Sequence, residues 1–463
     1  MTALMWFRND LRVADNPALS RACRHDQVIA CFFECAEQWR QHDVGPRRLA
    51  FLGRCVNALS RELAALGIPL VVETIDRFDA AGETLLRLAK EHGADSVFAN
   101  AEYPLNEKRR DAAAQKTLTD NGIRCSFSHG TVTAIPGSVL TQAGNTYAVF
   151  SPFKRRWMEI VPPHTVALCE TPAAQGEAIA PATLASLAGV TVQLQADDYP
   201  GGERHAQARL QSFVTSNVEQ YADTRDMPSQ PGTSGLSPYL SVGAVSSNQC
   251  LAAALDQNEG RYTGGPADAW INEIIWREFY RHVVAAFPHV SRGEDFRPEY
   301  RRLPWRSAPA ELTAWQSGNT GYPFVDAGMR QLNETGWMHN RLRMVTAMFL
   351  TKHLLIDWRA GERYFMHQLV DGDFASNNGG WQWSASTGTD AAPYFRVFNP
   401  TTQGKRFDPE GHFVRRWIPE IASVPDRFLF EPHRSESAPD YPPPIVEHGF
   451  ARQRAIDTFK SIS

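Results

Sequence analysis

The sequence predicts an α/β domain with a doubly wound parallel sheet, followed by a larger domain that is mostly helical. Two observations predict this combination. Short apolar runs alternate with helical patterns over the first 130 residues, and the strand signals fade after about residue 205. The length of 463 residues also suits two or three domains. We therefore expect domains at residues 1–130 and 205–463, joined by a connector at residues 131–204.

Five apolar runs in the first domain are typical of strands. They are Ala3–Phe7, Val28–Phe33, Leu70–Glu73, Ser96–Asn100 and Ile123–Phe127. The helical patterns between them have ordinary start and stop signals, which are Asp15-Asn16-Pro17, Pro46, Gly67, Gly93 and Gly122. Because strands that are separated by helices pair in parallel, these runs predict a parallel, doubly wound sheet.

No glycine-rich phosphate motif accompanies this Rossmann-like layout. GxGxxG does not follow the first strand, and GxxxxGK[ST] occurs nowhere, which excludes the dinucleotide fingerprint and the Walker loop. Residues 165–205 are rich in Ala, Pro and Gly and predict a long connector. The helices that we expect beyond it are His205–Tyr221, Ser246–Leu255, Asp268–Ala286, Pro323–Leu332, Asn340–Leu354 and Gly361–Leu369.

The net charge of −4, from 47 Lys and Arg against 51 Asp and Glu, argues against a strongly basic nucleic-acid binder. Two segments are nevertheless locally basic: residues 277–306 hold seven basic and four acidic residues, and residues 396–416 hold five and two. Nine of the 12 tryptophans also fall between Trp270 and Trp417. Because phosphate contacts need only a local patch, the helical half is where we expect a ligand.

The seven cysteines form no CxxC pair, and a single one lies in the C-terminal half, so we expect reduced thiols and neither a zinc site nor an iron–sulfur cluster. The first 15 residues lack the apolar core of a signal peptide, and no apolar run is long enough for a membrane span. These features predict a cytoplasmic protein without a bound metal.

Two segments of the helical half combine polar and aromatic groups. Residues 232–238 place three hydroxyls and two glycines in a turn before a helix, which could cradle a phosphate or serve as a plain capping loop. In the helix 270–280, Glu273, Trp276, Arg277 and Tyr280 share one face. That face could recognise a ligand by stacking and hydrogen bonding, or it could be a solvated face with an ion pair.

Two further segments have the composition of a ligand site. In residues 337–344, Asn340, Arg343 and Met344 share a face that could line a pocket for a planar ring, with structural ion pairing as the alternative for the arginines. Residues 371–383 hold two carboxylates, three amides, three glycines and two indoles, which make a poor core and a good ligand site. An EF-hand is excluded there because the further oxygen ligands are missing.

With these segments in view, the chain closely resembles the photolyase/cryptochrome family, and within it the bacterial class I cyclobutane pyrimidine dimer photolyases. The resemblance covers essentially the whole chain. It is carried by WFRNDLRVADNPAL, WREFYRH, TGYPFVDAGMRQL, WMHNRLRM, DGDFASNNGGWQW and TGTDAAPYFRVFNPTTQGKRFD. It implies an α/β antenna domain, a long connector and a helical FAD domain, and light-dependent repair of pyrimidine dimers in UV-damaged DNA by reduced FAD.

The resemblance also assigns roles to residues. Those implied to hold FAD are Tyr221, Thr233, Ser234, Gly235, Leu236, Ser237, Asn340, Arg343, Asp371, Gly372, Asp373 and Asn377, the last facing the flavin N5. Those implied to contact the dimer or the DNA strand are Arg225, Glu273, Trp276, Arg277, Tyr280, Asn340, Arg341, Met344, Trp383 and Gln403. Electron transfer is implied for Trp305, Trp358 and Trp381, and packing is expected for Trp315 and Trp337.

Other members of the family differ at recognisable positions. The (6-4) photolyases carry a His-His pair where this chain has His339-Asn340, and plant-type and animal-type cryptochromes replace the amide at Asn377 by Asp or Cys. Both Trp276 and Trp383 are present, which favours a dimer in double-stranded DNA. A blue-light photoreceptor and a (6-4) photolyase remain the alternatives within the family, and a light-independent flavin oxidoreductase is the generic alternative.

The resemblance further implies a light-harvesting antenna. Asn106 and Glu107 match the contacts of a folate antenna, 5,10-methenyltetrahydrofolate, while Ser291-Arg292 stands where folate-binding relatives have Cys-Lys. A deazaflavin or a second flavin is the alternative antenna. We expect a monomer with no obligate protein partner and no membrane partner.

Overall fold

A computed structural model describes residues 1–192, 194 and 199–462 of the chain. The N-terminal part is built on a five-stranded parallel sheet with the order β3-β2-β1-β4-β5. Its strands are β1 (Thr2–Phe7), β2 (Gln27–Glu34), β3 (Leu70–Thr74), β4 (Ala94–Asn100) and β5 (Arg124–Ser128). The prediction of a doubly wound parallel sheet is confirmed, and each of the five strands lies within two residues of its predicted bounds.

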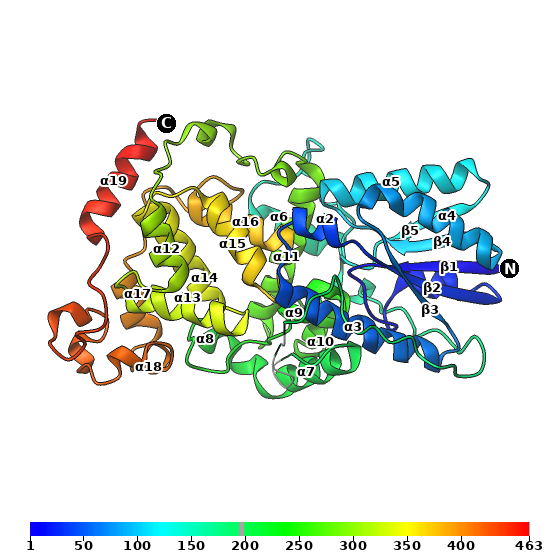
Figure 1. Ribbon diagram of the computed structural model, residues 1–463, viewed down its shortest axis with the longest axis horizontal. Helices are drawn as coiled ribbons and strands as arrows, with labels where there is room; N and C mark the ends of the chain where they lie inside the picture. The colour runs from blue at the N-terminus through cyan, green and yellow to red at the C-terminus, as the bar shows by residue number, and fades with distance from the viewer. Residues whose placement is uncertain (193, 195–198, 463) are drawn as a thin grey trace. The chain divides into compact units, whose positions relative to one another are not determined.

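Helices cover both faces of this sheet. They are α1 (Pro17–Ala22), α2 (Ala36–Gln41), α3 (Pro46–Ala65), α4 (Ala81–His92) and α5 (Leu105–Asp120). Figure 1 shows α4 and α5 side by side on one side of the strands and α3 on the other. All side chains of β1 from Ala3 to Phe7 are therefore buried, as is typical of a parallel strand that is covered on both faces.

The predicted helix signals act as expected. The side chain of Asn16 caps α1 by accepting a hydrogen bond from the backbone N–H of Leu19 at 3.1 Å. Gly93 ends α4 with φ of +63°, a left-handed conformation that favours glycine. Local capping chemistry therefore sets where these helices begin and end.

By their internal contacts, the residues form two compact units, which we describe separately. The first unit contains Met1–Glu219, Ser234–Pro288 and Val370–Asp373, and the second contains Gln220–Thr233, His289–Leu369 and Phe374–Ser463. The domain boundaries at residues 1–130, 131–204 and 205–463 stay a prediction. In the first unit, the helices after the sheet are α6 (Phe150–Ile160), α7 (Glu203–Ser216), α9 (Ser237–Val242), α10 (Ser247–Gln257) and α11 (Asp268–Ala286).

The described residues of the second unit form helices joined by turns and loops, with no β-strand among them. Its helices are α8 (Tyr221–Thr224), α12 (Pro309–Ser317), α13 (Pro323–Thr335), α14 (Asn340–Met348), α15 (Trp358–Gln368), α16 (Phe374–Ala385), α17 (Pro400–Phe407), α18 (His412–Trp417) and α19 (His448–Lys460). A π-helical turn at Phe349–His353 follows α14, where the sequence predicts one continuous helix to Leu354. The core of this unit contains Trp315, Trp358, Phe365 and Trp381.

The expected connector follows the surface of the first unit. Among its described residues, those between Thr165 and Glu203 form no α-helix or strand. Its backbone instead bonds to α3 and its end, for example from the N–H of Ile179 to the carbonyl of Ala64 at 3.0 Å. Backbone N–H groups of the connector, which lie outside any helix or strand, thus find their hydrogen-bond acceptors at the end of α3.

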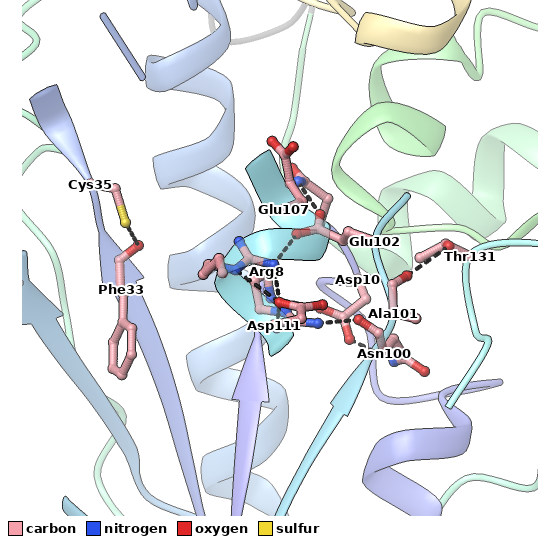
Figure 2. A network of polar contacts seen from close by, with 12 residues as sticks. Arg8, Asp10, Phe33, Cys35, Asn100, Ala101, Glu102, Glu107, Asp111 and Thr131 are labelled. Atoms are coloured by element: carbon pink, nitrogen blue, oxygen red, sulfur yellow. Dashed lines mark hydrogen bonds and ion pairs between the residues drawn. The ribbon is translucent and has the colours of Figure 1, made fainter. Parts of the chain in front are cut away.

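A buried polar network joins the carboxyl ends of β1 and β4, the point where the strand order reverses (Figure 2). Asp10 accepts hydrogen bonds from the backbone N–H of Arg8 at 2.7 Å and from Asn100 Nδ2 at 2.6 Å. The Arg8 guanidinium pairs with Asp111 at 3.3 Å. Ligands often bind at this position of a doubly wound sheet. Here the described side chains occupy it with their own ion pairs.

His282 provides a first testable prediction. Its ring is buried, and Nε2 lies 3.0 Å from the carbonyl oxygen of Ala134, while burial lowers its pKa to about 4. In the unfolded chain a histidine has a pKa of about 6.5, so the folded state binds the proton less readily than the unfolded state does. The neutral ring therefore contributes its full stability above pH 6.5, and this contribution is lost as the pH falls toward 4. Between pH 7 and 5.5 we expect the stability advantage of the wild type over His282→Gln to shrink by about 1 kcal/mol in urea denaturation. A constant difference would contradict a neutral buried imidazole.

Candidate active site

Helix α11 presents the four residues predicted to share a face. Glu273, Trp276, Arg277 and Tyr280 are all half-buried, while Ile274, Ile275, Glu278 and Phe279 between them are buried. The indole of Trp276 stacks on Phe150, with the ring centroids 3.7 Å apart and the planes 8° from parallel, and Tyr280 lies 5.6 Å from it. The indole is therefore held rigidly by aromatic neighbours. Its partner Phe150 was not expected from the sequence, because α6 lies within the predicted connector.

The other face of α11 is anchored by a buried carboxylate that sequence reasoning missed. Glu278 is fully buried and accepts hydrogen bonds from the backbone N–H groups of Thr133 and Ala134 at 3.0 and 3.1 Å. Burial raises the pKa of Glu278. Arg277 donates to the carbonyls of Thr131 and Leu240, both at 3.2 Å. Burial, assisted by the nearby Arg281, lowers the pKa of Arg277 to about 10. These bonds fix the orientation of the mixed face.

The turn that the sequence predicts as a phosphate cradle precedes the short helix α9. Thr233, Ser234 and Gly235 are half-buried, Leu236 is buried and Ser237 is exposed. Gly235 has φ of +61°, and a Cβ at this position would collide with the guanidinium of Arg209. The turn therefore combines hydroxyl groups with a neighbouring cation, which is a donor set that suits a diphosphate.

The acidic segment Val370–Asp373 belongs to the first unit. Asp371 and Gly372 are buried, and Asp373 forms an ion pair with Arg281 on α11 at 3.0 Å. A second cation in the same unit is Arg48 on α3, whose guanidinium is buried and donates to Asn9 and to the carbonyl of Ser241, both at 3.3 Å. Burial lowers the pKa of Arg48, and Asp373 and Asp371 oppose that effect.

In the second unit, α14 carries the 337–344 motif. Its first residue, Asn340, is exposed, while Arg343 and Met344 are half-buried. Arg343 Nε donates to the carbonyl of Met338 at 2.7 Å. Arg341 pairs with Asp226 at 2.5 Å and stacks on Phe407, with its guanidinium carbon 4.2 Å from the ring centroid. The structural ion pairing considered for these arginines is thus present at Arg341, whereas Arg343 bonds to a backbone carbonyl.

Helix α16 contains the strongest ligand motif of the sequence. The Nδ2 of Asn377 donates to the carbonyl of Glu362 on α15 at 3.0 Å, and that of Asn378 donates to the Glu362 carboxylate at 2.7 Å. The first of these bonds fixes the direction of the Asn377 amide. Trp381 is buried in the core, whereas Trp383 is half-buried on the same helix.

The three tryptophans implied in electron transfer all lie in the second unit but in different surroundings. Trp381 packs edge-on against Phe365 at a centroid distance of 4.9 Å. Trp358 is fully buried, and Trp305 is half-buried beside Phe459 at 6.5 Å. The buried Trp315 donates its N–H to the carbonyl of Thr346 at 3.0 Å, in agreement with a packing role.

The remaining predicted positions are distributed over both units. Tyr221 is buried, with the Arg225 guanidinium carbon 5.3 Å from its ring centroid. Gln403 is half-buried on α17. In the first unit, the Nδ2 of Asn106 lies 2.9 Å from Nε2 of His42, and Nδ1 of His42 lies 3.6 Å from Glu107. Burial and the nearby Glu102 raise the pKa of Glu107 to about 7. The sequence offered no signal for His42.

The predicted site residues separate into two groups. The first unit contains Asn106, Glu107, Ser234, Gly235, Leu236, Ser237, Glu273, Trp276, Arg277, Tyr280, Asp371, Gly372 and Asp373. The second unit holds Tyr221, Arg225, Thr233, Trp305, Asn340, Arg341, Arg343, Met344, Trp358, Asn377, Trp381, Trp383 and Gln403. Within the described ranges, no cluster of three or more His, Cys, Asp or Glu could hold a metal ion. No described helix is long and apolar enough to cross a membrane.

Comparison with known proteins identifies the family. The family model described as "FAD binding domain of DNA photolyase" matches residues 270–461, and the model "DNA photolyase" matches residues 3–173. A deoxyribodipyrimidine photo-lyase of Salmonella typhimurium is 46% identical over 99% of this chain and 98% of that protein. One from Escherichia coli is 43% identical over the same shares.

Solved structures agree with this result. A bacterial class III photolyase from Agrobacterium tumefaciens has a TM-score of 0.90 and 34% identity, and the match covers 100% of this chain and 97% of that one. A cryptochrome from Synechocystis has a TM-score of 0.88 and 26% identity, with 99% of each chain covered. The predicted combination of an α/β part and a helical FAD-binding part is confirmed. The chain belongs to the DNA photolyase family.

Proposed function

We propose that this protein uses light to split cyclobutane pyrimidine dimers in DNA. Reduced FAD, when bound, supplies the electron that opens the cyclobutane ring. The observation that supports this function best is the mixed face of α11, where the carboxyl group of Glu273 lies on the same helical face as the braced indole of Trp276. A light-independent flavin oxidoreductase would have no use for such a face.

The chain offers FAD a chemically suitable set of groups. The hydroxyls and backbone N–H groups of residues 233–237, beside the Arg209 guanidinium, suit the diphosphate. The residues that we propose around the flavin itself are Asn340, Arg343, Asp371, Gly372, Asp373 and Asn377, and Tyr221 completes the set. The fixed amide of Asn377 is the group that we propose to face the flavin N5.

The dimer must leave the base stack before it can react. Photolyases extrude the damaged nucleotides into a pocket, and damage lowers the cost because it weakens stacking and pairing. We propose Trp276 and Trp383 as apolar walls for the flipped dimer, with Arg277, Tyr280, Asn340 and Met344 as further contacts. Arg225, Arg341 and Gln403 are proposed to contact the DNA strand. Because Arg341 already pairs with Asp226, we expect a modest, salt-sensitive affinity for undamaged DNA.

For the antenna, we propose a folate, 5,10-methenyltetrahydrofolate, held through Asn106 and Glu107. The raised pKa of Glu107 supports this choice, because a protonated carboxyl group can donate a hydrogen bond to a heterocycle. A second flavin is the competing antenna, since an archaeal photolyase from Sulfolobus tokodaii, 28% identical with a TM-score of 0.80, was solved with two FAD molecules. The absorption spectrum of the purified protein distinguishes the two.

The decisive experiment compares repair in blue light with repair in the dark. Oligonucleotides that carry either a cyclobutane dimer or a (6-4) product are incubated with the purified, reduced protein. We expect light-dependent loss of the cyclobutane dimer alone. Repair that is absent, or equal in the dark, would exclude photolyase activity, and repair of the (6-4) product would favour the alternative photolyase. Blue-light chemistry of FAD without repair of either lesion would favour a photoreceptor.

Glu273 provides a direct test of the proposed pocket. We propose that the carboxyl O–H of Glu273 donates a hydrogen bond to a dimer carbonyl, where negative charge develops. Glu273→Ala removes this donor, and we expect it to lower the yield of dimer repair per absorbed photon about tenfold. Glu273→Gln should retain part of the yield, since the amide can still donate a hydrogen bond. Dimer binding is measured in parallel by filter binding. An unchanged yield for Glu273→Ala would exclude the electrostatic role.

A further inference from the structure

A buried carboxylate holds the indole of Trp358. Asp295 is 1% exposed, and its Oδ1 accepts a hydrogen bond from Trp358 Nε1 at 2.8 Å. Trp358 is itself 0% exposed. Both residues belong to the second unit, and the segment that carries Asp295 is tied to α16 by a hydrogen bond from the backbone N–H of Phe296 to Gln382 Oε1 at 2.8 Å.

The other oxygen of this carboxylate is occupied by Arg359. The Arg359 guanidinium donates to Asp295 Oδ2 at 2.9 Å and to Asp357 Oδ1 at 3.0 Å, and its central carbon lies 4.5 Å from the centroid of the Trp358 ring. The Arg359 cation therefore compensates the carboxylates of both Asp295 and Asp357. Among the hydrogen bonds of the described residues, only the one to Asp295 reaches the indole. This arrangement keeps a carboxylate acceptor next to Nε1 although Asp295 and Trp358 are both buried.

The surroundings of Trp358 differ from those of the other two tryptophans in the proposed electron path. Trp381 packs against the rings of Phe365 and Trp315, and Trp305 packs against Phe459. In the part of the chain that the structure describes, Trp358 is the one of the three whose N–H donates to a carboxylate. A charge-assisted hydrogen bond is roughly twice as strong as a neutral one, and low polarity strengthens it further.

We propose that Asp295 is a positioning residue that stabilises the oxidised form of Trp358. The inference rests on the proposed electron path. After Trp381 has lost an electron to bound FAD in the light, one electron passes from Trp358 to Trp381. Trp358 becomes a cation radical that keeps its Nε1 proton, and an electron from Trp305 later restores it. Because the positive charge strengthens the bond to Asp295, forward transfer becomes more favourable and return of the electron to Trp358 becomes slower.

The test stops the path at Trp358 and measures how long its radical survives. In a Trp305→Phe background, time-resolved absorption follows the decay of the tryptophan radical. Asp295→Asn keeps an oxygen acceptor of similar shape but removes the charge, and we expect the radical to decay about tenfold faster. The matched control is Asp357→Asn, which also removes one negative charge that pairs with the Arg359 guanidinium. Asn can still cap α15, because its side-chain oxygen can accept the bond from the Arg359 backbone N–H that Asp357 accepts in the wild type. The radical lifetime in this control should change less than twofold.

A variant of opposite sign covers the possibility that Asp295→Asn does not fold. Arg359→Gln removes the cation that lies over the ring, and we expect it to lengthen the lifetime of the Trp358 radical. Equal lifetimes for Asp295→Asn and Asp357→Asn, or a lifetime that Arg359→Gln shortens, would overturn the role of Asp295 alone. If light produces no tryptophan radical even in the unmodified chain, the electron path itself is wrong, and the inference falls with it.

Discussion

Trp305→Phe is expected to abolish light-driven reduction of the bound, oxidised FAD by an external thiol while dimer repair by pre-reduced protein continues. Phenylalanine is far harder to oxidise than tryptophan, so the last step of the proposed path to the surface is blocked. A barrier increase of only 1.4 kcal/mol slows a step about tenfold, and the replacement raises the barrier by more than that. Of the three tryptophans in the proposed path, Trp305 is the one that is half-buried rather than buried. Partial exposure is what a residue that accepts electrons from a reductant in solution requires.

The measurement is the rate of flavin bleaching under blue light with an excess of thiol. Trp337→Phe is the matched control, because Trp337 is a half-buried tryptophan of the same unit with a predicted packing role. It should leave photoreduction within about twofold of the wild type. Loss of repair in pre-reduced Trp305→Phe would contradict the role assigned to Trp305, because the electron that splits the dimer does not pass through it.

The sequence predicted the N-terminal sheet well because every signal there is local. Each strand is an apolar run, and residues such as Asn16 and Gly93 mark helix ends through bonds to their own neighbours. Helix α11 was predicted with its observed bounds for the same reason, since its apolar residues follow a helical period.

Helix α16 shows where local signals fail. Its Gly and Asn residues are poor helix formers, and the segment, interpreted as a polar ligand site, was not among the helices expected from the sequence. The helix is held instead by contacts from elsewhere in the chain, namely the bonds from Asn377 and Asn378 to Glu362 on α15. Tertiary packing overrides propensity there.

The functional motifs and their support differ in the same way. Trp276, Trp358 and Trp383 could be singled out because their residue types and family pattern are informative. The groups that brace them could not, because Phe150 and Asp295 lie far from their partners in sequence. A single Asp in a loop gives no signal that its carboxylate is buried against an indole. Long-range contacts of this kind require the fold.

Gly361→Ala is expected to destabilise the protein by about 2 kcal/mol, because one methyl group would enter a filled part of the core. Gly361 is buried within α15, where a Cβ would overlap the six-membered ring of Trp381 and approach Leu350 Cδ2 to 2.7 Å. Alanine favours a helix over glycine by roughly 1 kcal/mol, so only a steric cost can produce a net loss. The absence of a side chain at Gly361 therefore makes room for the indole of Trp381.

Gly380→Ala is the matched control for this experiment. Gly380 is exposed on α16, and no heavy atom lies within 4 Å of the position that its Cβ would take. The same substitution should therefore stabilise the fold by about 0.5–1 kcal/mol, through the helix and through the unfolded chain. Urea denaturation followed by circular dichroism measures both variants. Because the ring of Trp381 must move to admit the methyl group, Gly361→Ala should also slow photoreduction of FAD, an effect that a purely global loss of stability would not produce in the folded protein. If Gly361→Ala and Gly380→Ala change the free energy of unfolding and the rate of photoreduction alike, the close packing of the Trp381 ring against α15 is not what fixes the position of that ring.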